Sequence, residues 1–202
     1  FEPTTAQQGV GTHPHRGFET VTIAYQGEVT HQDSSGGGGT IKAGDVQWMT
    51  AGGGVLHQEF HSPEFAHQGG LFEMVQLWVN LPAHSKMTPA KYQAIEAAQI
   101  QSISLDDVGS ELRVIAGQYQ ERAGAATTFS PVNVWDGKIV AGQAHTFYVT
   151  EGHTTLLVVL SGEVILNDAQ HIEAPSLVVL SREEIDFTIK AEQDSKFLIF
   201  TG

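Results

Sequence analysis

The sequence lacks cysteine, and this absence excludes several kinds of site at once. There can be no disulfide, no thiolate-bound zinc, no iron–sulfur cluster and no thiol nucleophile. Any metal that the protein binds must therefore be held by imidazole and carboxylate groups. The absence of disulfides also agrees with a cytoplasmic location, which we expect for this protein.

Long apolar runs and basic residues are scarce as well. No segment reaches the roughly 18 consecutive apolar residues that would span a bilayer, so we expect no membrane partner. Lys and Arg number 10 against 23 Asp and Glu, which gives a net charge of −13 at pH 7. Because so acidic a chain repels a phosphate backbone, we expect no direct contact with nucleic acid. The first residue is Phe rather than Met, so we expect an N-terminal piece, with any targeting signal, to lie outside this sequence.

What the chain does contain is mostly the pattern of short β-strands between glycine-rich turns. Of its 202 residues, 41% are hydrophobic and 22 are glycine, enough for a hydrophobic core with many turns. Strands are predicted at 21–25, after the turn at Gly44, and at 72–81. The run at 72–81 is apolar on both faces, so we expect it to be buried. The glycines at 36–39 predict a loop.

The second half of the sequence repeats features of the first. The stretch "ETVTIAYQGEV" at 19–29 is similar to "TTLLVVLSGEV" at 154–164, and "IKAGDVQWMTAG" from Ile41 is similar to "IEAPSLVVLSRE" from Ile172. Two matched pairs in the same order indicate internal duplication of an all-β unit. We therefore expect two domains, at 1–105 and 106–202. A helix is predicted where the linker between the halves would lie, over 88–100, with Thr88 as its N-cap and Pro89 as its first residue.

Two pairs of metal-binding side chains stand out in the first half. His13 and His15 are separated by one residue, and so are His57 and Glu59. Residues i and i+2 of a strand point to the same face, so two such strands lying side by side would bring three imidazoles and one carboxylate together. A single pair of this kind is most often only surface, but two pairs within one repeat unit, each beside a glycine-rich turn, favour a metal site. Fe, Mn, Co, Ni, Cu and Zn all suit these ligands.

No comparable set of donors is found in the second half. The offsets between the repeats place four residues of the second half at the positions of the donors, and none of these four preserves a metal ligand: Tyr148, Thr150, Thr188 and Lys190. We therefore expect one metal ion per chain, in the first domain. Six further histidines are predicted to be ordinary surface residues: His31, His67, His84, His145, His153 and His171. Of these, His145 and His153 lack a second donor at i+2.

Four longer stretches resemble the pirin family of the cupin superfamily: "THPHRGFETVT", "HQDSSG", "GDVQWMTAGGGVLHQEF" and "MVQLWVNLP". The resemblance covers most of 9–92 closely and the second half more loosely. It implies an all-β protein with two cupin barrels (double-stranded β-helix, or jelly-roll) in one chain. It also implies one mononuclear iron site in the N-terminal domain, for which Fe(II) is the expected ion. Members of the family extend further at both ends.

Carried over residue by residue, the family's metal ligands fall on His13, His15, His57 and Glu59. Cupins in general often take their carboxylate from a glutamate that follows the His-x-His pair, where Glu19 stands in this sequence. The pirin pattern favours Glu59. Glu19 is then expected beside the ligands, bonded to nearby backbone or to Arg16.

The resemblance also implies an activity. Some pirins open the central ring of flavonols such as quercetin with O2 and release carbon monoxide. In such a reaction the metal would lower the pKa of the flavonol's 3-hydroxyl, and Glu59 is the expected catalytic base. Four apolar residues near the ligands in sequence are candidates for a flat aromatic pocket, with plain core packing as the alternative for each: Phe18, Trp48, Met49 and Phe72.

A second function is implied by the same resemblance. Pirins are also linked to regulation through protein partners, with the oxidation state of iron as the switch. On this alternative the chain is a non-catalytic redox sensor. A metal-stabilised barrel without turnover is a third alternative.

Overall fold

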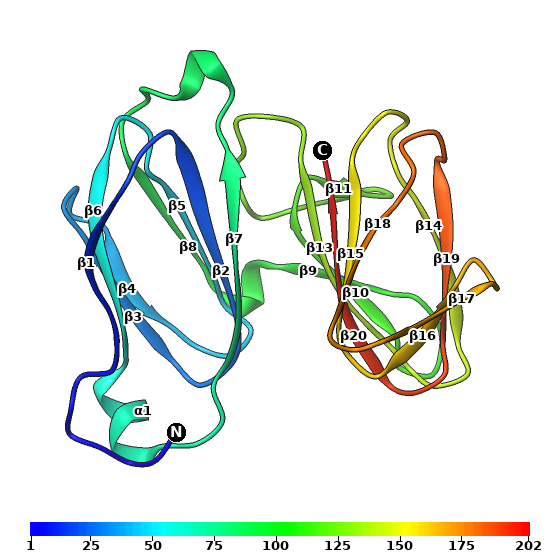
Figure 1. Ribbon diagram of the computed structural model, residues 1–202, viewed down its shortest axis with the longest axis horizontal. Coiled ribbons are helices and arrows are strands. Elements are labelled where there is room, and N and C mark those ends of the chain that lie inside the picture. The colour runs from blue at the N-terminus through cyan, green and yellow to red at the C-terminus, as the bar shows by residue number, and fades with distance from the viewer. The chain divides into compact units, whose positions relative to one another are not determined.

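The computed structural model describes residues 1–202 and divides them into two compact units, Phe1–Gln99 and Ile100–Gly202. Both units consist mainly of antiparallel strands (Figure 1). Helical structure is limited to α1 (Pro63–Gln68) and two short 3-10 helices, η1 (Ala83–Ser85) and η2 (Ala97–Gln99). None of these helices has the length and apolar character that a membrane span requires.

The first unit contains two four-stranded sheets. One has the order β1 (Gly9–His15), β6 (Val55–His61), β3 (Val29–Asp33), β4 (Gly38–Ile41). The other has the order β7 (Glu73–Asn80), β2 (Phe18–Gln26), β5 (Val46–Thr50), β8 (Lys91–Ile95). Side chains from both sheets meet in the interior of this unit: Gln47 of β5 and Gln76 of β7 bond to His31 of β3 and Glu59 of β6.

The second unit repeats this arrangement with additional strands. Its larger sheet has the order β18 (Ser176–Val179), β15 (Thr155–Ser161), β20 (Ser195–Thr201), β13 (Asn133–Ile139), β10 (Glu111–Ala116), β9 (Gln101–Ser104). Its smaller sheet has the order β14 (Ala144–Tyr148), β19 (Asp186–Ala191), β16 (Glu163–Leu166), β17 (Gln170–Glu173). A two-stranded ribbon joins β11 (Gln118–Tyr119) to β12 (Arg122–Ala123). Because β9 pairs with β10, the second unit begins before the expected boundary at 105.

The order of strands in the two units agrees with the repeat seen in the sequence. The sheet β1-β6-β3-β4 corresponds to β14-β19-β16-β17, and β7-β2-β5 corresponds to β20-β15-β18. In each unit the matched strands, β2 and β15, lead through Gly-Glu-Val into the other sheet. No ladder of hydrogen bonds closes the two sheets of a unit into one.

The helix predicted over 88–100 is wrong. This segment forms β8, whose five residues pair in register with β5, from Val46 opposite Ile95 to Thr50 opposite Lys91. Only η2 follows it. The hydrogen bonds offered by the edge of the sheet outweigh the helical signals of the local sequence, because intrinsic propensity is a weak preference.

Two further expectations about strands also need correction. The strand at 72–81 is not buried throughout, since Trp78 is 63% and Met74 37% exposed. Part of the expected glycine loop is strand β4, in which Gly38 and Gly39 have the backbone conformation φ +158° and +153°. The short helix α1 was not predicted, although Ser62 caps it by accepting a hydrogen bond from the backbone N–H of Phe65.

Candidate metal centre

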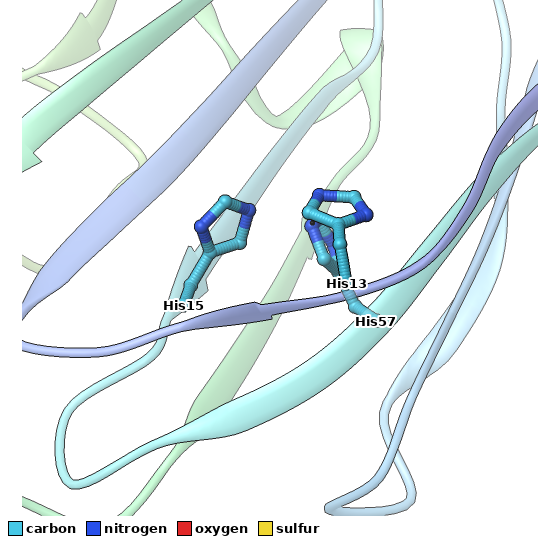
Figure 2. Close-up of side chains that lie close together, drawn as sticks. All are labelled: His13, His15 and His57. Carbon is cyan, nitrogen blue, oxygen red and sulfur yellow. Dashed lines mark hydrogen bonds between the residues drawn. The ribbon is translucent and has the colours of Figure 1, made fainter.

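Strands β1 and β6 lie side by side and present their histidines to the same space. The two strands are antiparallel, and His13 lies directly opposite His57. His15 follows at i+2 on β1, and Glu59 follows at i+2 on β6, so each pair shares one face of its strand. Figure 2 shows the rings of His13, His15 and His57 gathered beside one another on these two strands.

The three imidazoles are close enough to share one ion. Each offers a nitrogen atom within 4.8 Å of those offered by the others. The Nε2 atoms of His13 and His57 are 2.8 Å apart. Metal–nitrogen bonds of 2.0–2.1 Å place two neighbouring ligand atoms of an octahedral ion about 2.9 Å apart, which agrees with this spacing. Nε2 of His15 is buried without any hydrogen-bond partner, as expected for a nitrogen atom that coordinates a metal ion.

The rings are suited to be neutral ligands. Burial is the largest cause that lowers the pKa of His57, to about 3, and the neighbouring His31, His13 and His15 lower it further. Burial, followed by the nearby His13, also lowers the pKa of His15. Nδ1 of His13 lies 2.8 Å from the carbonyl oxygen of Gly11, so it carries the proton and leaves the Nε2 lone pair directed at His57. Neutral imidazole is the form that binds metal.

Glu59 belongs to a second, overlapping group. Its carboxylate lies within 4.8 Å of nitrogen atoms of His57 and His31. The amide of Gln76 donates to both carboxylate oxygens, at 3.2 and 3.0 Å, and also to the hydroxyl of Thr22. His57 is therefore common to both groups, and Gln76 orients the carboxylate beside it.

Glu19 lies outside both groups. It is on β2, in the other sheet, opposite Thr50, and accepts a hydrogen bond from the Thr50 hydroxyl at 2.6 Å. Burial raises the pKa of Glu19, which the bond from Thr50 opposes. Counting positions from His15 fails here because the chain changes sheets through Gly17, whose φ is +78°. Arg16, the expected partner, contacts Met87 instead.

The expected pocket residues lie in different places. Phe18 has its ring 5.0 Å from that of His15, and Met49 packs in a buried cluster with Tyr92 at its edge. Trp48 is fully buried and, as the neighbour of Met49 on β5, faces the other side of the sheet. Phe72 packs on a separate cluster of Ala24, Val29 and Ile41.

The position of Trp78 beside the histidines was not predicted from the sequence. Its ring stacks on Phe18 at 4.7 Å and lies 5.3 Å from the ring of His15. The side chain is 63% exposed, so an aromatic surface borders the histidines. Its place two residues after Gln76 on β7 puts it on the same face as the residue that binds Glu59.

His31 was predicted to be a surface residue, and that prediction is wrong. Only 1% of it is exposed. It contacts His57, Asp33 and Gln47, and its ring stacks on Tyr92 at 5.2 Å. The signal was present in "HQD", where an imidazole and a carboxylate stand at i and i+2 on a strand.

The other predicted surface histidines divide into two kinds. His67, His84 and His171 are exposed. His145 and His153 are half-buried: His145 faces the hydroxyl of Tyr119 at 2.9 Å, and His153 faces that of Thr201 at 3.0 Å. Burial lowers the pKa of His145.

The ladders identify the positions in the second unit that match the donors. Val29 pairs with His61 and His31 with Glu59, whereas Val164 pairs with Ala191 and Leu166 with Ile189. Because Val29 and Val164 are the valines of the two Gly-Glu-Val repeats, Ile189 matches Glu59 and Leu166 matches His31. Two residues earlier on the strand, Phe187 matches His57, and its partner Phe147 matches His13.

The second unit therefore has an apolar core where the first has its histidines. Phe147 and Phe187 are buried and stack with centroids 5.6 Å apart. The positions expected from the sequence offsets, among them Tyr148 and Thr188, are each one residue away from these. A shift of one residue along a strand points to its opposite face.

Comparisons with known proteins agree with this architecture. Residues 2–79 match the family model described as Pirin, and residues 134–202 match the Pirin C-terminal cupin domain. The chain is 48% identical over 202 residues to the Pseudomonas aeruginosa protein named "Putative quercetin 2,3-dioxygenase PA2418", covering all of this chain and 70% of that protein.

Solved structures are similar as well. The crystal structure of a quercetin 2,3-dioxygenase from Acinetobacter baumannii matches with 73% identity and a TM-score of 0.98, over 100% of this chain and 70% of that one. The fold, at 22% identity and a TM-score of 0.76, is also that of the bacterial pirin YhhW from Escherichia coli in complex with nickel(II), over 96% of this chain and 76% of that one. With its two cupin domains, the chain belongs to the pirin family.

Proposed function

We propose that this protein is a metal-dependent dioxygenase that opens the central ring of flavonols such as quercetin with O2. The observation that carries the proposal is the group of three imidazoles, His13, His15 and His57, beside a carboxylate and an exposed aromatic surface. The names of the similar Pseudomonas and Acinetobacter proteins supply the substrate class. Iron is the proposed ion, although a related bacterial pirin was crystallised with nickel(II).

The residues present fit such an ion. His13, His15 and His57 would hold it through nitrogen, and Glu59 through a carboxylate oxygen; the unpartnered Nε2 of His15 supports this assignment. When bound, a redox-active ion lowers the pKa of a coordinated hydroxyl and makes dioxygen chemistry accessible. We place the ion in the first domain, because the positions of the second domain that match the donors are apolar.

The side chains around the ligands would bind and orient the substrate. Phe18 and Trp78 form a stacked aromatic pair next to His15, on which a flat flavonol ring can lie. Glu59 would accept the proton of the 3-hydroxyl, because its carboxylate lies beside His57 and is held in place by Gln76.

The test is to load the protein with iron and follow quercetin in air. We expect the flavonol absorbance to fall together with dissolved O2, and carbon monoxide to be released. His57→Ala should abolish turnover, and His84→Ala, which changes an exposed histidine outside the cluster, should not.

A protein that binds iron stoichiometrically and consumes no flavonol would contradict the proposal. The non-catalytic alternative, an iron-binding sensor that acts through a protein partner, would then account better for the same ligands. Turnover in metal-free His57→Ala protein would show that the chemistry lies elsewhere.

A further inference from the structure

A chain of buried side chains leads from His57 to His31 and on to Asp33. Nδ1 of His57 is 3.2 Å from Nδ1 of His31, and Nε2 of His31 is 3.3 Å from a carboxylate oxygen of Asp33. The side chains of His31 and Asp33 are 0% and 1% exposed. Asp33 lies at i+2 from His31 on β3 and pairs across the sheet with His57.

Asp33 can only accept hydrogen bonds in this chain. The backbone N–H and hydroxyl of Ser35 donate to its Oδ1 at 2.8 and 2.6 Å, and the N–H of Gly37 donates at 3.0 Å. Burial raises the pKa of Asp33, but these bonds and the one from His31 outweigh it, so that the pKa is lowered overall. The carboxylate is therefore ionised, and Oδ2 faces His31 as an acceptor.

The carboxylate of Asp33 determines which ring nitrogen of His31 carries the proton. Nε2 of His31 must carry the proton that it donates to Oδ2, which leaves Nδ1 as an acceptor in the neutral ring. The amide nitrogen of Gln47 lies 3.0 Å from the same Nδ1 and can donate to it. Tyr92 stacks on the ring with an interplanar angle of 15°, which restricts its rotation.

The acceptor on His31 in turn selects one tautomer of His57. A ring that binds metal through Nε2 must carry its proton on Nδ1, and Nδ1 of His57 has the lone pair of His31 opposite it. We propose that Asp33 and His31 are positioning residues, which hold His57 as the Nδ1–H tautomer with its Nε2 lone pair directed toward His13. This inference rests on the proposed metal site, and it concerns metal affinity rather than the reaction.

Hydrogen-bond partners of metal-bound histidines affect metal affinity by a characteristic amount. Groups that accept the second N–H of a metal-bound histidine usually account for about 10- to 100-fold in metal affinity. Asp33→Asn would place an amide donor opposite His31, which would move the proton of His31 to Nδ1 and remove the acceptor for His57. His31→Leu would remove the acceptor outright, whereas the side chain of His31→Gln can accept from His57 and donate to Asp33.

The experiment measures the dissociation constant of Zn(II) for the full chain by competition with a chelator, without substrate. We expect Asp33→Asn and His31→Leu to bind zinc about 10- to 100-fold more weakly than wild type, and His31→Gln to recover most of the loss. Asp45→Asn is the matched control, because Asp45 also accepts backbone N–H bonds, from Lys42 and Ala97, but lies on a turn away from the histidines. Thermal unfolding of the metal-free variants reports any loss of folding separately.

Nitrogen-15 spectra of the imidazoles in the zinc-loaded protein give a second, direct result. We expect His31 protonated at Nε2 and not at Nδ1, and His57 protonated at Nδ1. Equal zinc affinity in all variants, or a spectrum in which zinc binds His31 itself, would overturn the inference. If the wild type binds zinc normally and the two variants Asp33→Asn and His31→Leu bind it more weakly, but no flavonol is consumed, the proposed function alone is refuted. If flavonol is consumed and both variants bind zinc as tightly as the wild type, only this inference is refuted.

Discussion

Replacing His57 with alanine should remove much of the acid sensitivity of the metal-free protein. In the folded protein the pKa of His57 is lowered from 6.5 to about 3, with burial as the main cause. In the unfolded chain this histidine binds a proton below pH 6.5, whereas the folded protein does not accept it until the pH approaches 3. The stability linked to His57 is therefore fully present above pH 6.5 and is lost as the pH falls from 6.5 toward 3.

The size of this loss follows from the difference between the two pKa values. Each pH unit below 6.5 costs about 1.4 kcal/mol, so that His57 should lower the free energy of unfolding by about 2 kcal/mol at pH 5 relative to pH 7.5. Urea denaturation of metal-free wild type and His57→Ala at both pH values measures the difference. His15 and His61 also have lowered pKa values, but they are present in both proteins and their contributions largely cancel.

The prediction concerns the difference between the two proteins, not the stability of either. The wild type should lose about 2 kcal/mol more than His57→Ala between pH 7.5 and pH 5. An equal loss in both would refute the reasoning, since it would mean that His57 is not held neutral by its buried position. The urea dependence of each transition shows whether the two proteins expose the same surface on unfolding.

Three further outcomes are expected. Elemental analysis should find one metal ion per chain, because the positions of the C-terminal domain that match the donors are apolar. A second ion bound in that domain would contradict this prediction. Glu59→Ala should lose metal while Glu19→Ala keeps it, because Glu59 lies beside His57 and Glu19 lies in the other sheet; the reverse result would exchange their roles. Trp78→Ala should raise the KM for quercetin at unchanged metal content, whereas an unchanged KM would show that the stacked ring does not contact the substrate.

Much of the fold and part of the site could be predicted from the sequence, because strand periodicity is local information. Alternation along a strand determines which residues share a face, so the spacing of His13 with His15 and of His57 with Glu59 is enough to orient each pair. The absence of cysteine restricts the ligands to imidazole and carboxylate. The repeated Gly-Glu-Val stretches are likewise a local signal, and they predicted the two matching units.

Only the tertiary structure decided which strands became neighbours. Residues 88–100 carry helical signals, but the edge of β5 makes part of them a strand. Glu19 follows His15 closely in sequence, yet the turn at Gly17 sends it into a different sheet. The burial of His31 depends on contacts with His57, Gln47 and Tyr92, which come from three other strands, and its spacing with a carboxylate in "HQD" could not reveal those contacts. Pairing between strands depends on contacts far apart in the chain, and those contacts select the register on which every donor in this centre depends.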